Sequence, residues 1–226
     1  MKNARERTDV KAKHLLERCL LLLAGLVIMA YGVSFSIQAG LGTSPISSLP
    51  YTVSQLAPLT VGTATIAMHC VLIALQILLL RRSYRPVQLL QLPVALLFGT
   101  LTDLALLSIR DLTAESYLCQ WLYCLLGIIL VGVGVSCEVK ADLIPLAGEG
   151  FILAVCRTFS LPFPPVKVGF DCTLVALACL LGVIFSGTLL GVREGTVAAA
   201  LMVGLIAKQL GKLLSHWKLE GEPGGK

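Results

Sequence analysis

Six apolar stretches, each about as long as a membrane-spanning helix, constrain this chain more than any other feature. A hydrocarbon core of about 30 Å takes roughly 20 helical residues to cross. Backbone N–H and C=O groups inside lipid have to be satisfied within the protein, so we expect helices. Hydrophobic residues make up 56% of the chain and charged residues 14%, which excludes an ordinary soluble domain. The stretches are residues 15–39, 61–80, 88–109, 117–138, 165–187 and 195–215.

An internal repeat with an offset of 102 residues divides the chain into two halves, 15–109 and 117–215. Seven residues carry it: Leu23, Gly25, Gly32, Val33, Ser34, Ala39 and Leu41 recur as Leu125, Gly127, Gly134, Val135, Ser136, Ala141 and Leu143. Each half has three spans, and an odd number inserts the second half upside down. We therefore expect an all-α polytopic membrane protein of two inverted three-helix repeats, with a basic cytoplasmic tail at 1–14 and a second cytoplasmic tail at 216–226. Each repeat should have a broken or short helix after its first span.

Basic residues predict the orientation of these spans. With the N-terminus in the cytoplasm, all of the 18 Lys and Arg residues except Arg110 and Arg193 lie on the cytoplasmic side or in the tails. This asymmetry follows the positive-inside rule and places both termini in the cytoplasm. The net charge of +5 is therefore interpreted as a topology signal rather than as a sign of nucleic-acid binding. The partner that it indicates is the anionic surface of the lipid bilayer.

A glycine-rich break follows the first span, in the run Gly40-Leu41-Gly42-Thr43-Ser44-Pro45. The glycines permit backbone angles that a helix does not hold, Ser44 is a good N-cap, and Pro45 suits the first helical turn. Residues 46–56 are too short to span, so we expect a half-helix whose positive end faces bound substrate. A tight extracellular turn into an interfacial helix would need the same residues. The candidate substrate-binding residues here are Gly40, Gly42, Thr43 and Ser44.

The corresponding break in the second half, residues 142–150, carries acids in place of small residues. Inverted topology puts it on the cytoplasmic side, followed by a short segment at 151–163 and the helix-stopping pair Pro164-Pro165. Glu138 and Asp142 are candidate gating or coupling residues. A solvated helix end would explain both carboxylates equally well.

Two ionisable residues lie deep in the spans, where an uncompensated charge costs at least about 2.5 kcal/mol. His69 and Asp171 are 102 residues apart, so we expect them at the two ends of a polar cavity, about 9 Å apart in depth. They are candidates for substrate binding and for proton or ion coupling. Lys167 offers Asp171 a simpler partner one helical turn away. Asp103 and Lys208 are typical of side chains that reach toward the membrane surface.

The last span follows the run Gly191-Val192-Arg193-Glu194-Gly195-Thr196. Arg193 and Glu194 form either an exposed ion pair or an outer gate. Together with the earlier Gly-Leu-Gly-Thr-Ser-Pro run, this motif resembles the bacterial YitT/YczE group of integral membrane proteins, over nearly the whole chain in the number and order of spans. The resemblance implies a bacterial inner-membrane protein, with transport, including export, as the usual suggestion. It supplies no catalytic residues.

Several classes of function lack their motifs in this sequence. There is no ATP-binding glycine loop, no His-Glu-x-x-His and no Gly-x-Ser-x-Gly turn, and the eight cysteines show no metal-ligand spacing. We therefore expect no enzyme, cofactor or metal site. The sequence favours a secondary transporter or exporter of an unidentified small molecule held near the helix breaks. The alternative is a substrate-capturing or scaffolding subunit of a larger complex, and a homo-oligomer also stays open.

Overall fold

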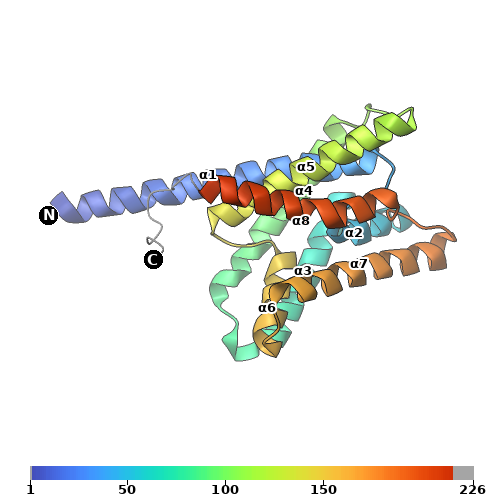
Figure 1. Cartoon of the computed structure of the whole chain (residues 1–226). Helices are drawn as coiled ribbons and strands as arrows, with labels where there is room; N and C mark the ends of the chain where they lie inside the picture. The colour runs from blue at the N-terminus through green and yellow to red at the C-terminus, as the bar shows by residue number, and fades with distance from the viewer. Residues whose placement is uncertain (1, 216–226) are drawn as a thin grey trace.

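The computed structural model describes residues 2–215, which form helices and connecting loops and contain no strand. Six of the helices are long and apolar enough to cross a membrane, as expected (Figure 1). The elements are α1 Lys2–Gln38, α2 Pro45–Leu56, α3 Val61–Leu80, the 3-10 turns Arg81–Ser83 and Pro86–Leu90, α4 Gln91–Ser108, α5 Tyr117–Ala141, α6 Ala147–Phe159, α7 Phe163–Ser186 and α8 Glu194–Ser215.

The order of helix lengths recurs along the chain. A long helix, a short helix and two long helices make up α1–α4, and the same order makes up α5–α8. The short helices α2 and α6 have 12 and 13 residues, too few to span a membrane. The predicted short helix after the first span of each half is therefore present twice.

Several predicted boundaries differ from the structure. Helix α1 begins at Lys2, so residues 2–14 continue the first span as helix. Helix α6 begins at Ala147 rather than 151 and ends at Phe159, where Ser160 adopts a left-handed conformation with φ of 53°. The proline pair at 164–165 opens α7 instead of ending α6, because a proline in the first turn loses no helical hydrogen bond. The predicted tail at 216–226 lies outside the described residues.

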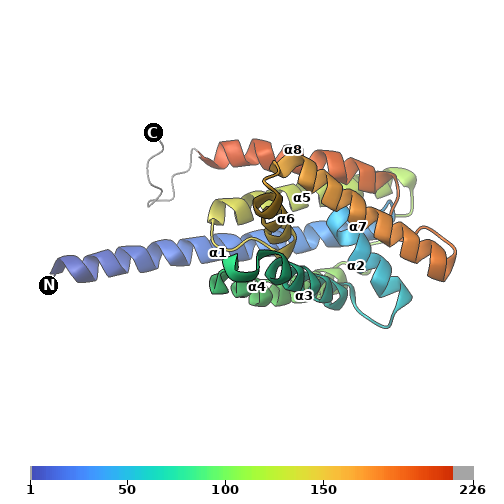
Figure 2. The same ribbon diagram turned by 90° about the horizontal axis from the view of Figure 1, so that it is seen from below.

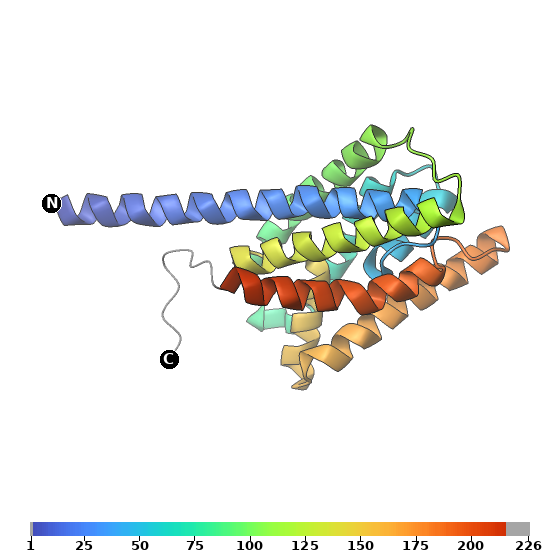
Figure 3. The same cartoon turned by 45° about the horizontal axis from the view of Figure 1, so that its top comes forward.

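Helices α1 and α5 form the most extensive helix pair of the molecule and run antiparallel, side by side (Figure 3). Their backbones touch at glycines. A Cβ atom at Gly25 would lie 3.0 Å from the carbonyl oxygen of Gly134, and one at Gly32 would lie 2.9 Å from that of Gly127. Small residues let helices approach this closely in a membrane, where no hydrophobic effect drives them together.

The remaining helices pack around this pair in matched ways. Helix α4 packs on α1 and α8 packs on α5, while α2 lies against α7 and α6 against α3 (Figure 2). Helices α3 and α4 also pack closely on each other. Helices α7 and α8 make almost no contact, and theirs are the least buried of the six spans.

We predict that Gly32→Ala destabilises the protein because the added methyl group would lie 2.6 Å from the backbone nitrogen of Val131. Overpacking of this kind costs about 1–3 kcal/mol. The measurement is the midpoint of thermal unfolding in a neutral detergent. Gly169→Ala on α7 is the matched control, since no atom lies within 4 Å of its added methyl group. Equal midpoints for the two variants would contradict the close α1–α5 contact.

Candidate functional site

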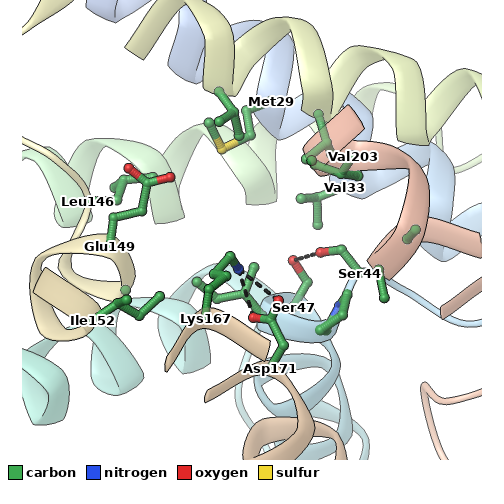
Figure 4. A pocket seen from close by; sticks show the side chains of 18 of the residues that line it. Met29, Val33, Ser44, Ser47, Leu146, Glu149, Ile152, Lys167, Asp171 and Val203 are labelled. Atoms are coloured by element: carbon green, nitrogen blue, oxygen red, sulfur yellow. Dashed lines mark hydrogen bonds and ion pairs between the residues drawn. The ribbon is translucent and has the colours of Figure 1, made fainter. Parts of the chain in front are cut away.

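A cavity of about 350 Å³ lies where the two halves of the chain meet (Figure 4). Its lining is mostly apolar, in contrast to the polar cavity that we expected from the sequence. Every one of the eight α-helices contributes to it, through side chains that include Val33, Ser47, His69, Phe98, Val135, Glu149, Lys167 and Val203. A pocket of this size and character suits a small molecule with a large apolar part.

An ion pair projects from α7 into this cavity (Figure 4). The ammonium of Lys167 donates to both carboxylate oxygens of Asp171, at 2.7 and 2.9 Å. Asp171 therefore pairs with Lys167, the simpler of the two interpretations that the sequence allowed. Glu149 reaches toward the cavity from α6, without a hydrogen bond or ion pair to any described residue. Burial raises the pKa of the Glu149 carboxyl, and Lys167 opposes that rise.

His69 lines the same cavity from α3 and is 1% exposed. Its ring stacks on Phe98, with centroids 6.3 Å apart and planes at 14°. Its Nδ1 atom has no hydrogen-bond partner among the described residues. The structure thus brings His69 and Asp171 to one cavity, as their repeat positions predicted, with Asp171 engaged by Lys167 and His69 still able to bond a ligand.

Most of the first break pairs with the loop between α7 and α8, and only its last residues face the cavity. The Thr43 amide donates to the Gly191 carbonyl at 3.0 Å, and the Gly195 amide donates to the Leu41 carbonyl at 2.8 Å. Because these bonds satisfy the backbone of the break, it serves as a clasp between the two halves. Of the four predicted binding residues at this break, Gly40, Gly42, Thr43 and Ser44, only Ser44 lines the cavity.

Ser44 occupies the N-cap position of α2 with Pro45 at the first helical position, as expected. Its hydroxyl donates to the Ser47 hydroxyl at 3.0 Å rather than capping a backbone N–H. Arg193 donates to the Gly40 carbonyl at 2.8 Å and pairs with the Glu194 carboxylate at 3.1 Å. Arg193 therefore adds a third tie between the break and the α7–α8 loop.

The acids of the second break separate into different environments. Glu138 is buried, lines the cavity and accepts a 2.6 Å hydrogen bond from the Leu146 amide at the start of α6. Asp142 adopts a left-handed conformation at the end of α5, and its exposed side chain lies 4.0 Å from Arg18. Only Glu138 of this pair can act on the cavity.

Sequence reasoning missed the roles of two carboxylates. Asp103 accepts hydrogen bonds from the Thr60 hydroxyl and the Gly62 amide, at 2.6 and 2.7 Å, and so joins α4 to α3. Glu149 was part of the acid-bearing break without being singled out. The sequence feature that could have indicated Glu149 is its place between Gly148 and Gly150. These glycines let α6 pack closely, since a Cβ at Gly148 would lie 2.5 Å from the Ile46 side chain.

We predict that Gly42→Ala destabilises the protein more than Gly40→Ala. Both glycines have positive φ, +93° and +66°, so each alanine costs about 1–2 kcal/mol in backbone strain. Gly42 also packs against Thr196 and the Arg193 backbone, which adds about 1–3 kcal/mol, whereas Gly40 has open space. Thermal unfolding of the two variants in detergent measures the difference. A Gly42→Ala protein as stable as Gly40→Ala would contradict the clasp.

Comparison with known proteins places this architecture in a family. A family model described as "Family of unknown function (DUF6198)" matches residues 16–212. YyaS of Bacillus subtilis, an uncharacterized protein, is 29% identical over 184 residues, which cover 80% of this chain and 86% of YyaS. An uncharacterized protein of Haemophilus influenzae is 23% identical over 195 residues, 83% of this chain and 80% of its own length.

The relationship to YczE is the one that the sequence motifs suggested. The uncharacterized membrane protein YczE of Bacillus subtilis is 26% identical over 199 residues, 87% of this chain and 86% of YczE. No solved structure matches the chain. The family match over residues 16–212, together with the six apolar helices, gives the assignment: the chain belongs to the DUF6198 family of unknown function and is a YczE-like integral membrane protein.

Proposed function

We propose that this protein is a secondary transporter or exporter that holds an unidentified small molecule in the cavity between α1–α4 and α5–α8. The observation that carries the proposal is the lining of that cavity by all eight α-helices. A site at the interface of two halves lets one half move against the other and open the cavity to either side. A site within one half would not couple to such a motion.

The proposal includes an inverted repeat, which the pattern of helix contacts supports. Gly25 contacts Gly134 and Gly32 contacts Gly127. Since Gly127 and Gly134 are the repeat mates of Gly25 and Gly32, a twofold axis would convert one contact into the other. The α2–α7 and α3–α6 contacts are related in the same way. Repeat mates that run antiparallel across their contact are expected when such an axis lies in the membrane plane.

The proposed setting is the bacterial cytoplasmic membrane, with both termini in the cytoplasm. The asymmetry of Lys and Arg supports this orientation, and two relatives come from Bacillus subtilis and one from Haemophilus influenzae. The clasp between the first break and the α7–α8 loop then lies on the outer side. Lys167 and Glu149 lie in the cytoplasmic half of the cavity.

Proton or ion coupling is proposed for the ionisable groups of the cavity, His69 and Asp171. His69 is 1% exposed and has a ring nitrogen without a hydrogen-bond partner in the described part of the chain. Asp171 pairs with Lys167, and a cation or a proton would compete with that pair. We assign no enzymatic reaction and no cofactor to the cavity. A proton gradient across the membrane would drive substrate movement only if these groups exchange protons during transport.

We predict that filling the cavity abolishes ligand binding. The measurement is a thermal-shift screen of a small-molecule library on three purified proteins: wild type, Val135→Trp and Val139→Trp. Val135 lines the cavity, whereas Val139, one turn later on α5, is 61% exposed. Compounds that stabilise wild type and Val139→Trp should fail to stabilise Val135→Trp. Ligands that bind all three proteins equally would contradict the cavity as the binding site.

The best ligand then tests transport against the alternative of a substrate-capturing subunit. Wild-type protein alone in liposomes should exchange the radiolabelled ligand across the bilayer, and an imposed pH gradient should make that exchange accumulate ligand if protons are coupled. Binding without exchange by the protein alone would contradict an autonomous transporter and support the subunit.

A further inference from the structure

The two halves differ in how their last two helices meet. In the first half, α3 and α4 are locked together: Gly62 and Gly99 are in backbone contact, and Asp103 of α4 accepts hydrogen bonds from Thr60 and the Gly62 amide at the start of α3. A carboxylate bonded to a helix N-terminus is among the stronger ties available between two helices. The wall of the cavity is therefore closed on this side.

The described residues of the second half contain no counterpart of this lock. Pro164 and Leu205 stand 102 positions after Gly62 and Asp103. Pro164 has no backbone N–H to donate, and Leu205 has no carboxylate to accept it. Helices α7 and α8 accordingly make almost no contact and diverge from the loop that joins them (Figures 1 and 3). Their outward surfaces are the least buried of the six spans, so the gap between them faces the bilayer.

This gap leads into the cavity. Lys167 and Asp171 of α7 and Ala200 and Gly204 of α8 all line the cavity. Gly204 is exposed, and no atom lies within 4 Å of where its Cβ would be. The α8 side of the gap therefore consists of small residues that leave room for an alkyl chain.

The charged side chains in the cavity indicate the chemistry of the polar end of its ligand. Three carboxyls, of Glu138, Glu149 and Asp171, face one ammonium, of Lys167. Glu138 is engaged by the Leu146 amide and Asp171 by Lys167, which leaves Glu149 without a bonded partner among the described residues. A carboxyl in a mostly apolar site ionises only when a cation pairs with it, so a bound ammonium beside Glu149 would supply the partner that this side chain lacks. The free Nδ1 of His69, 1% exposed, adds a second unused polar atom.

We propose that the ligand is an amphiphilic amine that moves sideways from the bilayer between α7 and α8, places its ammonium at Glu149 and leaves its alkyl chain against the small residues of α8. This inference rests on the proposed function for the location of the site. It adds the class of ligand and the route by which that ligand reaches the cavity.

Native mass spectrometry of the purified protein in a neutral detergent tests the ligand class. The probes are dodecylamine, dodecanol, dodecanoate and butylamine. We expect one dodecylamine per chain, bound at least about tenfold more tightly than the other three, because a charge-assisted hydrogen bond contributes at least the roughly 1.4 kcal/mol to which a tenfold difference corresponds. Glu149→Gln should remove the preference for the amine over dodecanol. Preferred binding of dodecanoate, or butylamine bound as tightly as dodecylamine, would overturn the proposal.

Two variants on one helix test the route. Gly204→Leu fills the gap beside the cavity, while Gly211→Leu adds the same side chain at a position on α8 that also has open space but does not line the cavity. Gly204→Leu should weaken dodecylamine binding at least about tenfold and Gly211→Leu should leave it unchanged. Thermal unfolding confirms that both variants fold. Equal binding by the two variants would overturn the α7–α8 route.

The two proposals fail differently. If library compounds bind wild type but not Val135→Trp while dodecylamine does not bind at all, the amphiphilic amine is wrong and the transport cavity stands. If no compound of either kind distinguishes Val135→Trp from wild type, the cavity itself is not a binding site and both proposals fall.

Discussion

The glycine contact between α1 and α5 is the constraint on which the rest of this structure depends. Gly25 and Gly32 meet Gly134 and Gly127 backbone to backbone, so the two first helices of the halves cross without room for side chains between them. One helix then packs on each flank of this pair, α4 beside α1 and α8 beside α5. The short helices α2 and α6 each pack against a long helix of the opposite half. The cavity is the space that the eight helices leave between the two halves. A bulkier residue at any of these glycines would separate the halves and change the shape of the cavity.

The two halves match in the order of their helices and differ in chemistry. Asp103 closes α3 onto α4, and nothing in the described part of the second half closes α7 onto α8 in the same way. The break before α2 carries small residues and is fastened to the α7–α8 loop through Thr43 and Gly191, whereas the α6 side carries Glu138 and Glu149. The first half thus supplies the lock between α3 and α4, while the second half supplies the three carboxyls of the cavity, those of Glu138, Glu149 and Asp171.

The sequence predicted the spans, the two short helices and the shared position of His69 and Asp171, because these follow from segment length, from glycine and proline chemistry and from a fixed offset. It did not predict the pairing of Thr43 with Gly191, since no local pattern indicates which of two glycine-rich loops lie together. It did not predict the bonds of Asp103 for a related reason: no local pattern indicates which helix N-terminus lies beside that carboxylate. The apolar character of the cavity also depends on packing, as its lining comes from eight helices.

The central claim is that the two halves enter the membrane in opposite directions. Leu59 and Leu161 test it most directly, because they are repeat mates in the loops that follow α2 and α6, and both are exposed, at 45% and 48%. In a background without the native cysteines, a membrane-impermeant maleimide applied to intact cells should label Leu59→Cys, and should label Leu161→Cys only after the membrane is permeabilised. Labelling of both positions from the same side would show that the halves are parallel, and would contradict the inverted repeat together with the transport cavity between its halves.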